Sequence, residues 1–199
     1  NDVQSTAKTT DIFTGAESPA TPRYPDGGSI MTTAAAYLAH SWEINEKYIL
    51  TEGVRFNYVN LQSIWKDTSL FHFPFDFVEQ KNNAVNGNIG FVAMPGYGWR
   101  FTLLGSSGFR APNVDDMGKV NESSQGTLII PNPVLKPEIA YSGEAGIAKN
   151  FSGKVKMEAV YFYTHLQNAI VLKDDKLNGA DSVVYDGLMS KVQSAQNAD

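Results

Sequence analysis

The sequence predicts an all-β fold, an antiparallel meander of about six strands. Six segments alternate apolar and polar residues, which is the pattern of strands with two different faces. Short connections join these segments in pairs, and long polar connections separate the pairs. No run of eighteen apolar residues occurs, so no transmembrane helix is predicted.

The composition excludes several other classes of protein. The chain has 199 residues, of which 42% are hydrophobic and 12% aromatic, and this is too apolar for a disordered protein. The net charge is −5 and no dense Lys/Arg cluster occurs, so we expect no nucleic-acid partner. Cysteine is absent, which excludes disulfides and thiolate metal sites.

The strands are predicted as three hairpins. Residues 1–28 are rich in Thr, Ser, Pro and Gly and precede the hairpins as a loop. The connections inside the hairpins, residues 45–46, 95–98 and 150–153, are short enough for tight turns. The predicted strands span residues 30–44, 47–61, 84–94, 99–109, 139–149 and 154–171.

Long loops are predicted between the hairpins, at 62–83 and 110–138, and a polar tail at 172–199. Such loops are uncommon in compact soluble domains. Their strict alternation with short turns is typical of outer-membrane barrels, which place short turns in the periplasm and long loops outside. In that arrangement the chain begins and ends in external loops.

The charged strand residues indicate which face would turn inward in a barrel. Arg55, Arg100 and Glu144 fall on the polar side of their alternating patterns, whereas Glu52 interrupts an apolar side. A charge facing lipid costs roughly 2–4 kcal/mol at the membrane midplane. We therefore expect Arg55, Arg100 and Glu144 to face the lumen.

Two motifs lie a little over twenty residues apart. The first is Gly108-Phe109-Arg110-Ala111-Pro112-Asn113, and the second is Pro131-Asn132-Pro133-Val134-Leu135-Lys136-Pro137-Glu138. Their prolines would hold extended chain where strand pairing stops, and Arg110 could pair with Glu138 at the rim. Together with Gly53-Val54-Arg55-Phe56-Asn57, these motifs resemble the C-terminal half of the barrel of TonB-dependent outer-membrane receptors, with wording closest to the Bacteroidetes type.

The resemblance implies that residues 1–199 are a partial receptor barrel, with the plug domain and most strands absent. It implies a bacterial outer-membrane location, contact with outer-membrane lipid, and coupling to the TonB complex through the missing plug. The implied function is active uptake of a scarce small-molecule or glycan ligand, namely a siderophore, cobalamin, haem or a glycan. Because six strands cannot close a large barrel, we expect the fragment to self-associate.

Two other interpretations remain open at this stage. A secreted soluble β-sandwich or small barrel that binds carbohydrate would show the same alternation, with its apolar face buried in a core. A β-rich surface or adhesion protein is the second rival. The direction of the apolar residues, outward or into a dry core, discriminates between them and a membrane barrel.

Candidate binding residues are sparse. The aromatic segment Phe71, His72, Phe73 and Phe75 could form a ligand platform with Arg110, or it could pack its own rings against the rim. The family branch that imports haem carries a His between the two motifs, and residues 113–130 contain none.

The sequence predicts neither an enzyme nor a cofactor. The acidic pairs Asp115-Asp116 and Asp174-Asp175 could bind Ca²⁺, but isolated pairs in loops are usually solvated, so we predict no metal site. No motif organises a nucleophile with a base.

Overall fold

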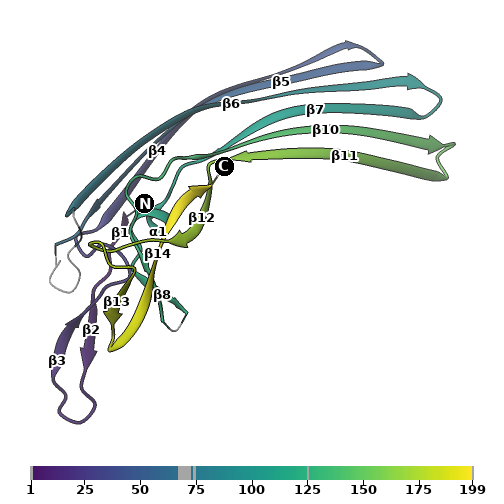
Figure 1. The fold of residues 1–199 in the computed structure, drawn as a ribbon. Helices are drawn as coiled ribbons and strands as arrows, with labels where there is room; N and C mark the ends of the chain where they lie inside the picture. The colour runs from purple at the N-terminus through teal and green to yellow at the C-terminus, as the bar shows by residue number, and fades with distance from the viewer. Residues whose placement is uncertain (1, 67–72, 74, 125, 199) are drawn as a thin grey trace.

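A long antiparallel sheet dominates the computed structural model, which describes residues 2–66, 73, 75–124 and 126–198. The sheet order is β1-β4-β5-β6-β7-β10-β11, so the long strands are neighbours in chain order. This confirms the predicted all-β class and the six-stranded antiparallel meander. Figure 1 shows these strands arching together. Their bounds are β4 (Ser29–Asn45), β5 (Tyr48–Ile64), β6 (Phe77–Gly96), β7 (Trp99–Arg110), β10 (Glu138–Phe151) and β11 (Val155–Gln167).

Two of the hairpin turns are closed by residues with positive φ. Tyr97 (φ 52°) and Gly98 (φ 76°) join β6 to β7, and Ser152 (φ 51°) and Gly153 (φ 75°) are the first two of the three residues that join β10 to β11. Two consecutive residues of this kind match the right-handed twist of paired strands. The turns are therefore tighter than the predicted connections 95–98 and 150–153.

The strand β6 continues through part of the predicted turn by way of an irregularity. Its register with β7 shifts between Ala93 and Gly96. Pro95 lies in this interval and has no backbone N–H to donate, so regular pairing cannot pass through it.

The cross-strand register defines two faces of the sheet. On the apolar face, Phe91 pairs with Leu50 and Leu103. On the polar face, Arg55 pairs with Tyr37 and Asn86. Because paired residues point to the same side, the alternation predicted from sequence is continuous across the strands.

The segments predicted as loops contain secondary structure, so that part of the prediction was wrong. Strand β5 extends to Ile64 and β6 begins at Phe77, which shortens the loop 62–83. Residues 1–28 include β1 (Asp2–Val3) and the hairpin of β2 (Ala7–Thr10) and β3 (Glu17–Ala20). The remaining segments form α1 (Val114–Met117), β8 (Asn121–Ser124), β9 (Thr127–Ile130), β12 (Ala169–Asp174), β13 (Ser182–Tyr185) and β14 (Leu188–Ala198).

These last six elements, which we call the loop layer, are built on a second sheet. Its order is β12-β14-β9-β8. Strand β12 pairs with residues 193–198 of β14, and β13 pairs with residues 188–191 of the same strand. Strand β14 runs parallel to β9, with Val192 opposite Leu128. The predicted loop 110–138 and tail 172–199 are thus paired to each other, a long-range contact that no local pattern announces.

The predicted strand 154–171 is divided in the structure. Strand β11 ends at Gln167, and Asn168 has a φ of 54°. Asparagine adopts this left-handed conformation more readily than most residues. The conformation of Asn168 redirects the chain into β12. The prediction of one continuous strand through residue 171 was therefore wrong.

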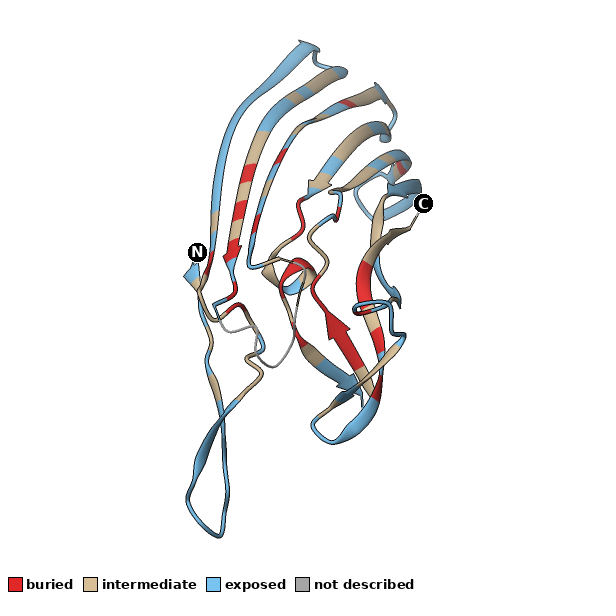
Figure 2. Ribbon diagram, turned by 60° about the vertical axis from the view of Figure 1, so that its left-hand side comes forward, coloured by how far each residue is buried: buried red, intermediate tan, exposed pale blue. Residues whose placement is uncertain are grey.

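The buried residues gather where the loop layer meets the sheet (Figure 2). Leu61 and Val78, from the polar face of β5 and β6, pack in one cluster with Trp65, Met117 and Leu135. A second cluster lies inside the loop layer and contains Val120, Leu128, Ile130, Leu177 and Val192. Figure 1 shows the loop layer beneath the arch, so the polar face is the concave one.

Candidate functional site

The two sequence motifs meet at the loop end of the sheet. Arg110, the last residue of β7, lies opposite Glu138, the first residue of β10, and its Nε donates to a carboxylate oxygen of Glu138. Arg110 Nη1 also donates to Asp116 Oδ2 at 2.7 Å. The other Glu138 oxygen accepts from the Ile170 N–H at 2.6 Å. This network joins β7, α1, β10 and β12, as expected for residues that fix loop geometry.

The hydrogen bonds of this network favour the ionised form of Glu138. Hydrogen bonding to Arg110 lowers the pKa of Glu138, partial burial opposes the shift, and the Ile170 N–H adds to it. The pKa of Arg110 is raised, chiefly by the same bond. Glu138 is therefore a carboxylate near neutral pH and forms an ion pair with Arg110.

The acidic pair Asp115-Asp116 serves the helix α1. Asn113 and Asp116 form a reciprocal capping box, with Asp116 N donating to Asn113 Oδ1 at 3.0 Å and Asn113 N donating to Asp116 Oδ2 at 3.0 Å. Asp115 Oδ1 accepts from the Tyr24 hydroxyl at 2.9 Å, and this bond is the largest cause of the raised pKa of Tyr24. Within the described ranges, no group of three or more His, Cys, Asp or Glu is placed to hold a metal ion.

Asparagines tie the second motif to the loop layer. Asn197 Oδ1 accepts from the Lys136 N–H at 2.7 Å, and Asn197 Nδ2 donates to the carbonyls of Lys136 and Asn168. Asn132 Nδ2 donates to the Ala195 carbonyl at 2.7 Å. The motif therefore anchors β14, a role that sequence reasoning missed because the partners lie about sixty residues away.

The aromatic segment packs inward where it is described. Phe73 and Phe75 stack with ring centroids 5.8 Å apart, and Phe75 meets Trp65 edge-on at 5.3 Å. Both phenylalanines pack against the cluster at the sheet end. Phe71 and His72 lie outside the described residues.

The residues predicted to face the lumen share one side of the sheet. Arg55 pairs with Asn86, Arg100 with Ala148, and Glu144 with Leu104. The register places all three on the polar face, the side that carries Leu61 and Val78 into the loop layer.

Shallow hollows cover the β5 and β6 part of the polar face. One of about 290 Å³ is lined by Arg55, Gly53, Asn86 and Asn88. Another of about 490 Å³ is lined by Arg55, Asn57 and Arg110. Asn86 and Asn88 were not singled out from sequence, although their alternation with Val85, Gly87 and Ile89 already placed them on the polar side.

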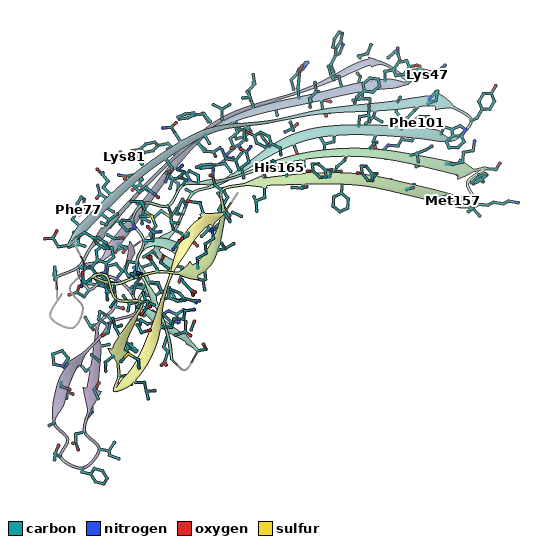
Figure 3. All side chains as sticks on the ribbon, in the orientation of Figure 1. Lys47, Phe77, Lys81, Phe101, Met157 and His165 are labelled. Carbon is teal, nitrogen blue, oxygen red and sulfur yellow. The ribbon has the colours of Figure 1, made fainter. Side chains whose placement is uncertain are left out.

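The apolar face is open to the surroundings. Val85 is 68% exposed, Leu103 58% and Tyr161 72%. Aromatic rings lie toward the short turns, where Trp99 stacks on Phe101 and carries Lys149 Nζ at 4.6 Å from its ring centroid. Figure 3 labels Phe101, Lys47 and Met157 toward this end.

The described histidines are far apart. His40 Nδ1 lies 3.1 Å from Glu52 Oε1 on β4 and β5, so the acid that interrupts the apolar pattern has a local partner. His165 lies on β11, at the opposite edge of the sheet. Within the described ranges, no helix is long and apolar enough to cross a lipid bilayer.

Comparison with known proteins gives a family match over almost the whole chain. The family model described as TonB dependent receptor-like, beta-barrel matches residues 2–198. Among curated proteins no match is found.

Solved structures share the fold. The haemophore receptor HasR of Serratia marcescens, in a complex with its haemophore HasA and haem, superposes with a TM-score of 0.69 at 14% identity, over 96% of this chain and 32% of its own. The copper transporter OprC gives the same TM-score and identity over 28% of its length. The FrpB iron transporter of Neisseria meningitidis gives a TM-score of 0.52 at 18% identity, over 85% of this chain and 22% of its own. The chain thus spans about a third or less of these proteins.

Proposed function

Because the chain belongs to the TonB-dependent receptor β-barrel family, we propose that it forms part of the wall of an outer-membrane receptor for active uptake of a scarce ligand. The observation that carries this proposal is the two-sided sheet. Its apolar face is uncovered, its polar face is concave, and its long connections fold at the end away from the short turns. A barrel wall between lipid and an aqueous lumen requires this combination.

In this proposal the apolar face contacts outer-membrane lipid, and Arg55, Arg100 and Glu144 line the lumen. The short turns face the periplasm, and the loop layer faces outward. Energy would come from the proton-motive force through TonB, acting on a plug domain in the lumen. The function is transport, and we infer no catalytic role for this chain.

The ligand class stays open among a siderophore, cobalamin, haem and a glycan. The similar structures include transporters of copper and iron and a receptor seen with haem, which supports a metal or metal complex. We infer that Phe73, Phe75 and Arg110 support the loops, because the rings pack on Trp65 and the guanidinium meets two carboxylates. Phe71 and His72 remain predicted ligand contacts.

A soluble carbohydrate-binding sandwich or a surface adhesin is less well supported. Either fold would bury the apolar residues of the sheet in a dry core. Here Val85, Leu103 and Tyr161 are largely exposed, and the loop layer packs on the opposite face.

Adjacent residues on opposite faces provide the test. The chain has no cysteine, so Thr102→Cys and Leu103→Cys each introduce one labelling site. Each variant is assembled in outer membranes and spin-labelled. We expect the label at 103 to be relaxed mainly by oxygen, which partitions into lipid, and the label at 102 mainly by a water-soluble nickel complex. Equal or reversed accessibilities would contradict a barrel wall.

A further inference from the structure

Arg110 and Arg100 each interact with an acidic side chain, whereas Arg55 has no such interaction with the residues that the structure describes. Arg110 contacts two carboxylates, Arg100 interacts electrostatically with Glu158, and Arg23 lies over the Tyr24 ring. Within the described part of the chain, the single hydrogen bond of Arg55 runs from Nε to Asn57 Oδ1 at 2.7 Å. The charge of Arg55 is therefore oriented but not neutralised.

The hydrogen bonds beside Arg55 have a fixed direction. A guanidinium only donates, so the Asn57 atom that faces it must be the carbonyl oxygen. Asn57 Nδ2 then donates to Asn86 Oδ1 at 2.8 Å, which leaves Asn86 Nδ2 as the outward end of the chain. Both amide orientations follow from the chemistry of arginine and do not depend on a choice between oxygen and nitrogen.

Arg55 and Asn86 have donor groups left over. Arg55 Nη1 and Nη2 and Asn86 Nδ2 donate no hydrogen bond to the described residues. Asn88 contributes a further amide, which can present its NH2 as a donor and has no hydrogen bond to the described residues. Several donors around one positive charge match a group that only accepts, such as a carboxylate or a phosphate.

The surrounding space admits such a group. Arg55 lines hollows of about 290 and 490 Å³ on the polar face. Gly53, on the same face, permits the arrangement, because a Cβ there would lie 2.9 Å from Asn88 Nδ2. The glycine thus leaves room for the Asn88 amide to lie across β5 beside Arg55.

We propose that Arg55, Asn86 and Asn88 form a binding site for an anionic oxygen group of the transported small molecule. This rests on the proposed function, since the ligand reaches the site only if the polar face lines the lumen. Arg55 supplies the charge and two parallel N–H groups, and the amides supply neutral donors that hold the bound anion in one orientation.

Simple anions test the site. Citrate and inorganic phosphate, with glycerol as the neutral control, are titrated into the membrane-assembled protein purified in non-ionic detergent. Binding is followed by the ¹⁵N resonance of the guanidinium Nε that disappears in Arg55→Gln. We expect both anions, and not glycerol, to shift this resonance, and the stronger of the two identifies the preferred chemistry.

Three variants separate the site from general charge attraction. Arg55→Gln should weaken anion binding measured by calorimetry about tenfold or more, since charge-assisted hydrogen bonds are lost. Asn86→Asp still accepts from Asn57 but replaces the outward donor by an acceptor, and should also weaken binding. The matched control Arg100→Gln removes the same charge from the same face and should leave binding within about twofold.

Two results would overturn the proposal. One is equal weakening by Arg55→Gln and Arg100→Gln, which indicates non-specific attraction. The other is that the wild-type protein binds neither anion, while the Arg55→Gln variant has a lower thermal stability than the wild type. This result would indicate that Arg55 forms an ion pair with a carboxylate elsewhere in the same protein. The spin-label accessibilities at 102 and 103 report on the barrel wall separately, so failure of the site and failure of the function are distinguishable.

Discussion

The long sheet and the loop layer are stabilised in different ways. The sheet pairs neighbours in the chain, exposes its apolar face and has little interior away from the loop end. The loop layer is built from short strands that pair across long sequence separations, and Leu128 and Val192 in its centre are fully buried. The sheet therefore depends on its surroundings for the burial of apolar surface, whereas the loop layer contains a core of its own.

This difference also explains why the two regions are unequally visible in the sequence. A strand with one exposed face alternates apolar and polar residues, so the sequence of β6 predicts both the strand and the direction of its two faces. Strand β9 reads Thr127-Leu128-Ile129-Ile130, and its last three residues are all buried although they alternate between the two sides of the strand. A four-residue apolar run of this kind cannot be assigned from its pattern alone.

The largest expected effect concerns the exposed sheet. In detergent-free buffer the chain should associate, because the edge of β11, the edge of β4 beyond its two-residue pairing with β1, and the apolar face are open among the described residues. Light scattering should report large particles that break down to monomers when detergent covers this face. A compact monomer whose size does not change with detergent would show that the sheet does not depend on its surroundings to bury its apolar face.

The next effect concerns the core of the loop layer. Leu128→Ala removes a fully buried side chain and should lower the stability of the loop layer by about 2–5 kcal/mol. Leu103→Ala, on the exposed apolar face, should change stability in detergent by no more than about 0.5 kcal/mol. Hydrogen exchange of the β9 and β14 amides measures the first change, and exchange of the β7 and β10 amides measures the second. Similar losses in the two variants would show that the regions do not differ as described.

The smallest effect concerns the joint between the regions. Glu138 and Arg110 lie at the loop end of the strands, outside the apolar band, and Glu138 has a lowered pKa in the folded state. Its stabilisation is therefore complete above the unfolded-state pKa and is lost as the pH falls through the folded-state pKa. We expect the ion pair of Glu138 with Arg110 to contribute about 1–2 kcal/mol to the stability of the folded state. This value is reduced because Arg110 is partly exposed to solvent.

Protection of the Ile170 amide, which donates to Glu138, should fall along that acid limb. Glu138→Gln provides the control, because it cannot ionise and should show reduced protection that does not change over the same pH range. If protection of the Ile170 amide in the wild-type protein is as independent of pH as in Glu138→Gln, the ion pair does not stabilise the joint.

The candidate site was only partly predictable. The motif residues Arg110 and Glu138 were paired from sequence, because strand ends flanking one loop must meet when their strands are neighbours. The side of Arg55 followed from alternation, but its isolation from every described carboxylate did not. That property depends on which residues of β4 and β6 lie opposite it, and register is set by the assembled sheet.

The sequence by itself determined the all-β class, the hairpin order and the two faces of the long strands, because period-two alternation and turn chemistry act over a few residues. Tertiary structure alone decided the parallel pairing of β9 with β14 and the direction of the Asn86 amide beside Arg55. Each of these depends on groups that are distant in the chain or on different strands. Their positions are fixed only when the sheet and the loop layer pack together.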